Sequence, residues 1–389
     1  MPTELMTPEP PQVSPQWVRS AVVAAQQIPA PGSHGKYSDA ADVLRGLGLI
    51  QLDPLTRVST AQRLTCLTRL PRKHPAEQVD AALWPAEAPA SFEAFTKVAC
   101  VFPLEDWPLL RLRREATRQR HGHKISPTVR ERILQVVAEH PGGVATGVIE
   151  AAFGPERTTG WHWSEVKKIT ELMVRMGELV VTARDGVVRL FDLPERALPA
   201  DVRHAEALPD DVLRAQLARR AAGALAVMTV SDFAHHYHLS KHDAALGVEL
   251  AGLTAVRVPQ WRETAYVAAE LLQTPVPEPG IGAVKDARLI GPFDPLLRDR
   301  RRAQRIFGFD YTFEAYVPRQ KRVYGHYVMG LLSGTELIGR VDLRRQHGEL
   351  VVNRFWVEPG TPRRSGLART KAAAATLARQ LGVTLRLPE

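Results

Sequence analysis

An amide and a carboxylate two positions apart make the segment Gln51-Leu52-Asp53 a candidate for chemistry. The apolar run GLGLI, residues 46–50, leads into it and predicts a helix end followed by a short extended stretch over 49–52. In an extended chain, residues two apart point to the same face, so Gln51 and Asp53 would face one way and Leu52 the core. A carboxylate beside an amide can orient a water molecule, withdraw its proton and stabilise a developing positive charge. Cleavage of a glycosidic bond needs these three functions.

A purely structural role for Asp53 fits the same residues. Pro54 follows directly, and Asp-Pro is common in loops, where the aspartate caps the next turn. The local sequence taken alone favours this second interpretation, so both stay open at this point.

A basic segment farther along the chain is a candidate for binding a polyanion. In AYVPRQKRVYGHYVM, residues 315–329, two aromatic-rich strands are predicted to flank a tip that contains Arg319, Lys321 and Arg322, with Tyr324 beside it. A cationic hairpin of this kind can enter a groove, contact phosphates and wedge bases apart. An ordinary solvated hairpin is the alternative.

A second basic segment precedes it. In GPFDPLLRDRRRAQRIFGFDY, residues 291–311, Arg300 and Arg301 belong to an arginine cluster. The cluster either contacts phosphate or pairs with Asp294 and Asp299, and the sequence favours neither interpretation.

Composition narrows the class of protein. The 389 residues are 44% hydrophobic and 24% charged, which is typical of a soluble globular protein, and no run of 18 apolar residues indicates a membrane span. The net charge of +9 predicts nucleic acid or an anionic surface as partner, although a bias in amino-acid usage would give the same number. Two isolated cysteines indicate a reducing compartment.

Metal and cofactor sites are not predicted. The histidine-rich run HHYH, residues 235–238, has no carboxylate or thiol at ligand spacing. The chain also lacks a phosphate-cradling glycine-rich loop and a Gly-x-Ser-x-Gly elbow.

The order of the expected helices and strands that must position these residues predicts an α+β fold, with tandem winged-helix units and a C-terminal antiparallel meander. Residues 126–200 give the clearest pattern, because three helices precede two β-rich runs joined by Asp185-Gly186, a strong hairpin signal. The acidic, Pro-rich N-terminus lacks the order of a signal peptide, which favours a cytoplasmic protein. The predicted divisions are a disordered lead-in over 1–14, a first winged-helix unit with the catalytic motif over 15–125, a second over 126–200, a third over 205–275, and a C-terminal meander over 280–389. The meander is predicted to contain strands at 311–318, 322–333, 336–343 and 350–359, the basic hairpin and a terminal helix.

Together these segments resemble the bacterial winged-helix DNA glycosylases that repair bulky alkyl adducts and interstrand crosslinks, the YcaQ/AlkZ-like family. The resemblance runs from about residue 16 to 380 and is most specific from Phe293 to Leu343. Trp161-x-Trp163 with the helix after it, and RLFDLPERALP over 189–199, resemble the family's middle region. The family's catalytic element is Gln–apolar–Asp or Gln–apolar–Gln, so Gln51-Leu52-Asp53 places this chain on the YcaQ-like side.

The resemblance implies a monofunctional glycosylase that needs no cofactor and acts on N7-alkylguanine in double-stranded DNA. Asp53 would position or activate water and stabilise the sugar cation, and Gln51 would hold the water. A C-shaped, concave surface on a monomer would bind the DNA. The predicted DNA-binding residues are Arg57, Arg300, Arg301, Arg319, Lys321, Arg322 and Tyr324.

Three positions depart from the YcaQ-like pattern. Gln62 and Lys97 stand where histidines are usual, and Arg298 stands where a tryptophan is usual. These departures motivate the hypothesis of a specialised member that gives a producer self-resistance to a DNA-alkylating natural product. The alternative function is a winged-helix transcriptional regulator without chemistry, although the chain has no obvious heptad helix for dimerisation.

Overall fold

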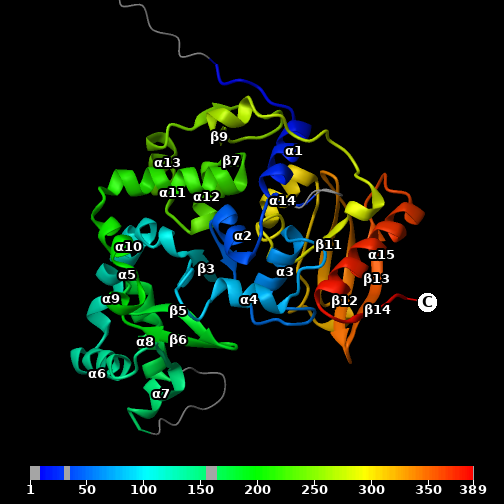
Figure 1. The fold of residues 1–389 in the computed structure, drawn as a ribbon. Coiled ribbons are helices and arrows are strands. Elements are labelled where there is room, and N and C mark those ends of the chain that lie inside the picture. The colour runs from blue at the N-terminus through cyan, green and yellow to red at the C-terminus, as the bar shows by residue number, and fades with distance from the viewer. Residues whose placement is uncertain (1–8, 30–35, 155–163, 389) are drawn as a thin grey trace, which may run out of the picture. The chain divides into compact units, whose positions relative to one another are not determined.

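The structure, a computed structural model, describes residues 9–29, 36–154 and 164–388 (Figure 1). Helices and mainly antiparallel strands make up the described residues, so the predicted α+β class is confirmed. In these ranges no helix combines the length and the apolar character needed to cross a bilayer. Trp161 and Trp163, and residues 1–8 of the predicted lead-in, lie outside the described residues.

The chain divides into two compact units that do not follow the predicted boundaries. The first unit takes residues up to 38, 54–75 and 214 onward, and the second takes 39–53 and 76–213. The predicted 15–125 unit is therefore shared between the two. Helix α3 (Ala61–Arg69) shows the reason, because nearly all of its side chains are buried and it packs against strand β10 (Arg288–Ile290), far away in the sequence.

A five-stranded sheet in the order β10-β11-β12-β13-β14 is the main element of the first unit. The three long strands form an antiparallel meander, and β14 pairs with β13 in parallel after the chain returns through α15. Helix α15 packs across the sheet (Figure 1). The bounds are β11 (Val328–Ser333), β12 (Glu336–Gln346), β13 (Glu349–Val357), α15 (Arg363–Gln380) and β14 (Thr384–Arg386).

The predicted first strand of the meander, residues 311–318, is wrong. These residues form no strand, and β10 takes the position beside β11. The reason is the buried carboxylate of Glu314, which accepts the backbone N–H groups of Val323, Tyr324 and Gly325 at 3.0, 2.8 and 2.9 Å. Backbone donors bonded to a side chain are not available to a strand ladder, so the predicted basic hairpin is instead a folded loop.

Two other helices of the first unit, α1 (Pro15–Ala25) and α14 (Arg300–Phe307), share a core with residues of β10 and β11. Capping residues set helix starts as the sequence predicts: Ser14 accepts the N–H of Trp17, and Thr229 forms a capping box with Asp232. The bounds of the other elements are α11 (Asp210–Leu225), β7 (Met228–Thr229), α12 (Val230–Tyr237), α13 (Lys241–Leu250), β8 (Thr254–Val256) and β9 (Ala265–Val267).

Residues 9–14 are not a disordered lead-in. Gln12 forms a parallel bridge with Arg257, and the N–H of Val13 donates to the Arg257 carbonyl at 2.9 Å. Backbone pairing with the end of β8 therefore orders this part of the predicted lead-in.

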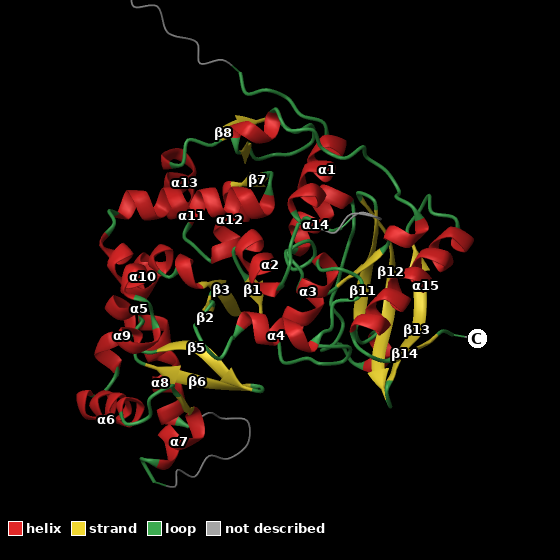
Figure 2. Ribbon diagram, viewed as in Figure 1, coloured by secondary structure: helices red, strands yellow, loops and turns green. Residues whose placement is uncertain are grey.

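The second unit contains two three-stranded sheets, β1-β3-β2 and β4-β6-β5 (Figure 2). The predicted turn at Asp185-Gly186 is confirmed, because Asp185 pairs with Val188 across it. The N-terminal strands and helices are α2 (Ala40–Leu47), β1 (Ile50–Gln51), α4 (Glu77–Leu83), β2 (Ser91–Phe95), β3 (Ala99–Pro103) and α5 (Arg111–His121). The later ones are α6 (Pro127–Ala138), β4 (Val144–Ala145), α7 (Thr146–Ala151), α8 (Glu165–Met176), β5 (Val180–Asp185), β6 (Val188–Asp192), α9 (Pro194–Ala197) and α10 (Ala200–His204).

Helix α8 starts and ends at residues of types that favour these positions. Ser164 accepts the N–H of Lys167 at 3.1 Å, and Gly177 ends the helix in the left-handed region with φ 74°. A Cβ at Gly177 would stand 2.5 Å from the Arg114 side chain, so both conformation and space require glycine there. The apolar face of α8 packs with α6, α7 and β6 around a core that includes Ile133.

Candidate functional site

The predicted catalytic pair lies at the end of a short strand in the second unit. Gly48 ends α2 with φ 72°, and the chain then extends into β1. Gln51 stands opposite Cys100 of β3, and the N–H of Leu52 donates to the Ala99 carbonyl at 2.8 Å. The predicted extended geometry is therefore confirmed up to the residue that precedes Asp53.

The two polar residues differ in exposure. Gln51 is only 8% exposed, whereas Asp53 is half-buried. Burial restricts the Gln51 side chain, and partial exposure leaves the Asp53 carboxylate accessible to water and to a substrate. The next helix, α3, begins at Ala61 with Thr60 at its N-cap position, so Asp53 does not cap a helix.

A turn on the neighbouring strands adds charge to the same unit. Residues Thr96–Val98 join β2 to β3, and the turn closes with the Thr96 N–H donating to the Val98 carbonyl at 3.0 Å. The guanidinium of Arg113 donates to the carbonyls of Phe95 and Thr96 at 2.9 and 2.8 Å. Burial and the nearby Arg175 cation lower the pKa of Arg113. Sequence reasoning missed Arg113, because no local signal connects it with a motif 60 residues away.

The predicted DNA contacts Arg319, Lys321 and Arg322 lie in the first unit, on the folded loop that replaces the hairpin. Arg319–Lys321 form one 3₁₀ turn, and both end residues are exposed. Arg322 is half-buried, and its Nε donates to the Val317 carbonyl at 2.7 Å. The loop therefore presents two cations to solvent and uses the third to close itself.

Aromatic residues of the same loop have separate environments. Tyr324 is half-buried against the Trp356 ring, with ring centroids 5.3 Å apart and nearly perpendicular planes, and the Arg340 guanidinium lies over its face. Tyr316 is 80% exposed and Val323 is 68% exposed. Of the three tyrosines in the predicted hairpin, Tyr316, Tyr324 and Tyr327, Tyr316 is exposed beside the cations, Tyr324 is half-buried and Tyr327 is buried.

Arg57 is brought close to this loop. Its carbonyl accepts the N–H of Arg345 on β12 at 2.8 Å, and its side chain is exposed. Burial, with the cations of Arg322 and Arg57, lowers the pKa of His326. The residues from 314 to 327 and Arg57 thus form one basic region of the first unit, which we call the basic loop region.

The arginine cluster at the start of α14 is only partly exposed. Arg301 is exposed, whereas Arg300 is half-buried and donates to the Pro292 carbonyl at 2.8 Å. Neither predicted aspartate serves as a surface partner of these two arginines. Asp294 is fully buried with Arg69 at 2.7 Å, and Asp299 caps α14.

The histidine-rich run belongs to the packing of the first unit. His235 lies 3.2 Å from the Asp299 carboxylate, and burial with the nearby arginines holds the pKa of His236 well below its usual value. Within the described ranges, no three His, Cys, Asp or Glu side chains are grouped so as to hold a metal ion.

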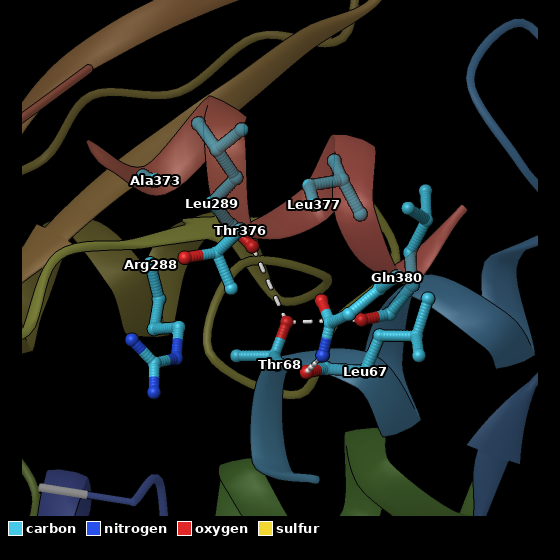
Figure 3. A pocket seen from close by; sticks show the side chains of 9 residues that line it. Leu67, Thr68, Arg288, Leu289, Ala373, Thr376, Leu377 and Gln380 are labelled. Carbon is cyan, nitrogen blue, oxygen red and sulfur yellow. Dashed lines mark hydrogen bonds between the residues drawn. The ribbon is translucent and has the colours of Figure 1, made fainter. Parts of the chain in front are cut away.

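A small cavity in the first unit lies among α3, β10 and α15 (Figure 3). Thr68 donates to the Leu289 carbonyl at one side, and Gln380 donates to the Leu67 carbonyl at the other. Its volume of about 10 Å³ holds one water molecule and no nucleobase. None of the predicted site residues lines it, so it is not the candidate site.

The chain is similar to a family of DNA glycosylases in sequence and to a solved DNA glycosylase in fold. The family model described as "DNA glycosylase AlkZ-like" matches residues 44–381. The solved structure of the Streptomyces sahachiroi DNA glycosylase AlkZ is similar over 97% of this chain and 100% of that chain, with a TM-score of 0.65 and 19% sequence identity. At that identity the structural likeness concerns the fold.

Proposed function

Because the chain belongs to the AlkZ-like family of DNA glycosylases, we propose that it hydrolyses the N-glycosidic bond of bulky N7-alkylguanine in double-stranded DNA. Glycosylase activity on DNA follows from the family. The substrate, the release of an abasic site without strand cleavage, and the unhooking of interstrand crosslinks are our proposals. The alternative of a transcriptional regulator without chemistry is set aside, since the family is one of enzymes.

The observation that carries the proposed mechanism is the placement of Gln51 and Asp53. A buried amide and a half-buried carboxylate stand two residues apart at the end of a paired strand. Guanine alkylated at N7 already carries a positive charge, so it departs without a general acid. The remaining needs are stabilisation of an oxocarbenium-like sugar and delivery of water to it.

We assign stabilisation of the sugar cation and delivery of water to Asp53 and Gln51. The Asp53 carboxylate faces the developing positive charge and accepts the proton of the attacking water. The Gln51 amide accepts from or donates to the same water and keeps it in line with the sugar. Pairing of β1 with β3 holds the backbone of Gln51 in place, so the position from which its amide reaches the water is set before the substrate binds.

DNA binding is assigned to the basic loop region and to Arg300 and Arg301. Arg57, Arg319 and Lys321 are exposed and suited to phosphate contact, and Tyr324 with Arg322 shapes the loop that presents them. The double variant Arg319→Ala/Lys321→Ala should weaken DNA binding and flatten its dependence on salt, by about 0.9 in the log–log slope for each lost phosphate contact. An unchanged slope would exclude these contacts.

Substrate choice is tested by the release of different bases. Purified protein is incubated with duplexes carrying N7-methylguanine, a mustard adduct or a bulky intercalating adduct, and base release is followed without heating. We expect the bulky adduct to be released fastest, as a specialised self-resistance enzyme in a producer's cytoplasm would require. Equal release of N7-methylguanine would refute the specialisation. The protein is proposed to act as a monomer, which sedimentation of the protein–DNA complex checks.

A further inference from the structure

The turn Thr96–Val98 lies at the same end of the sheet as the catalytic pair. In the antiparallel pairing of β1 with β3, Gln51 stands opposite Cys100 and the Leu52 N–H reaches the Ala99 carbonyl at 2.8 Å. Continued by one residue, this register sets Asp53 opposite Val98, the last residue of the turn. Lys97, at the tip of the turn, therefore lies at the end of the sheet where β1 ends and Asp53 follows.

Several contacts hold the turn in place. Arg113 on α5 donates to the carbonyls of Phe95 and Thr96, which directly precede the tip, at 2.9 and 2.8 Å. Arg175 on α8 lies over the Phe95 ring, 4.4 Å from its centroid. Two helices thus fix the backbone before Lys97, so its position relative to the β1 strand does not depend on a mobile loop.

The charge of Lys97 requires an explanation. Its side chain is exposed, and none of the ion pairs found among the described residues includes it. Arg113 and Arg175 add two more cations around the turn. A cationic turn close to the carboxylate that must stabilise a sugar cation would weaken that stabilisation. An anion from the substrate removes this conflict, and in DNA the anion nearest the reacting sugar is a backbone phosphate.

We propose that the Thr96–Val98 turn is a phosphate-binding element of the active site, in which Lys97 binds a backbone phosphate beside the nucleotide that loses its base. This inference rests on the proposed function and adds the contact that places the sugar against Asp53. Arg113 is the positioning residue, because its hydrogen bonds to the Phe95 and Thr96 carbonyls hold the backbone that leads to Lys97. The bound phosphate neutralises the ammonium, so the carboxylate acts on the sugar without a competing cation.

The test compares Lys97→Gln and Lys97→Arg with the matched control Lys371→Gln, an exposed lysine on α15. The probe is a duplex oligonucleotide with a tetrahydrofuran abasic site, and its Kd is measured from about 50 to 200 mM salt, a range over which phosphate contacts are resolved. Lys97→Gln should reduce the log–log slope by about 0.9, while Lys97→Arg and Lys371→Gln keep it. A wild-type slope in Lys97→Gln, or an equal reduction in Lys371→Gln, overturns the proposal.

A second readout separates this role from nucleophilic attack by the lysine. In single-turnover assays of base release, Lys97→Gln should raise the protein concentration that gives half-saturation. The rate of base release by the saturated complex should stay at the wild-type value. Borohydride reduction of wild type with abasic DNA should yield no covalent adduct, and an adduct that depends on Lys97 would overturn the phosphate role. Binding to the abasic probe needs no base release, so failure of the proposed substrate and failure of this inference give different results.

Discussion

Replacement of Glu314 by glutamine should loosen the loop that presents Arg319 and Lys321. One carboxylate oxygen accepts the N–H of Val323, and the other accepts those of Tyr324 and Gly325. A glutamine has a single acceptor oxygen, and its NH₂ group would face at least one of these donors in either orientation. The variant therefore loses one or two of three bonds to a charged group that is 5% exposed.

The magnitude follows from the number of lost bonds. A hydrogen bond to a charged group contributes about 1.5–3 kcal/mol, so the loss of one or two such bonds should ease local opening of the loop by about 1.5–6 kcal/mol. At about 1.4 kcal/mol for each factor of ten, exchange of the three amides should be faster by at least about tenfold and by up to about 10⁴-fold. Because the same loop presents the exposed cations, DNA binding should weaken in parallel.

Hydrogen exchange of residues 320–327 is the assay, with Glu278→Gln as the control, since Glu278 is an exposed glutamate of the same unit. Burial acts to raise the pKa of Glu314, but the three N–H groups and Arg322 lower it below its usual value. A carboxyl group whose pKa is lower in the folded than in the unfolded protein stabilises the folded state at pH values above its unfolded pKa, and this stabilisation is lost as the pH falls through the folded pKa. Wild type should therefore lose protection as the pH falls through the lowered pKa of Glu314. Wild-type exchange rates in Glu314→Gln would refute the reasoning.

Three further substitutions test the packing of the first unit. Asp232→Asn removes the partner of the buried Arg302, 2.9 Å away, and should cost about 3–5 kcal/mol in urea unfolding. Burial acts to raise the pKa of Asp232, yet the arginines lower it below its usual value, so the stability advantage of wild type over Asp232→Asn should disappear as the pH falls through this lowered pKa. Asp294→Asn leaves Arg69 buried without its carboxylate and should cost a similar amount by the same assay, whereas the double variant Asp294→Leu/Arg69→Met should recover most of the loss. Gly325→Ala places a Cβ 2.5 Å from a carboxylate on β12 at φ 141°, so calorimetry should show a lower Tm.

Local signals were sufficient to predict much of the fold. Asp185-Gly186 forms the turn between β5 and β6 that its hairpin signal predicts. Ser14, Thr229 and Ser164, which start helices as N-cap residues, are of types that favour this position. The extended segment that contains Gln51 is likewise predicted from the apolar run over 46–50 that precedes it. Each of these features is determined by residues within a few positions of one another, which is the range over which capping and turn chemistry act.

Features set by distant residues could not be predicted. The alternation of aromatic and polar residues over 311–318 is typical of a strand, but the backbone partners of Glu314 lie 9 to 11 residues away and cannot be read from alternation. The bond of Arg69 to Asp294 spans 225 residues, and it anchors α3 in the first unit. The contact of Arg113 with the turn before Lys97 likewise depends on packing between α5 and the sheet.

The central claim is that Asp53 performs the chemistry of base release. The most direct measurement is release of N7-alkylguanine from duplex DNA by wild type and by Asp53→Asn, compared at matched DNA occupancy and without heating. The account predicts release by wild type and a rate lower by a factor of roughly a hundred or more in the variant. Equal rates in the two proteins, or no release by wild type from methyl, mustard and bulky intercalating adducts alike, would contradict it.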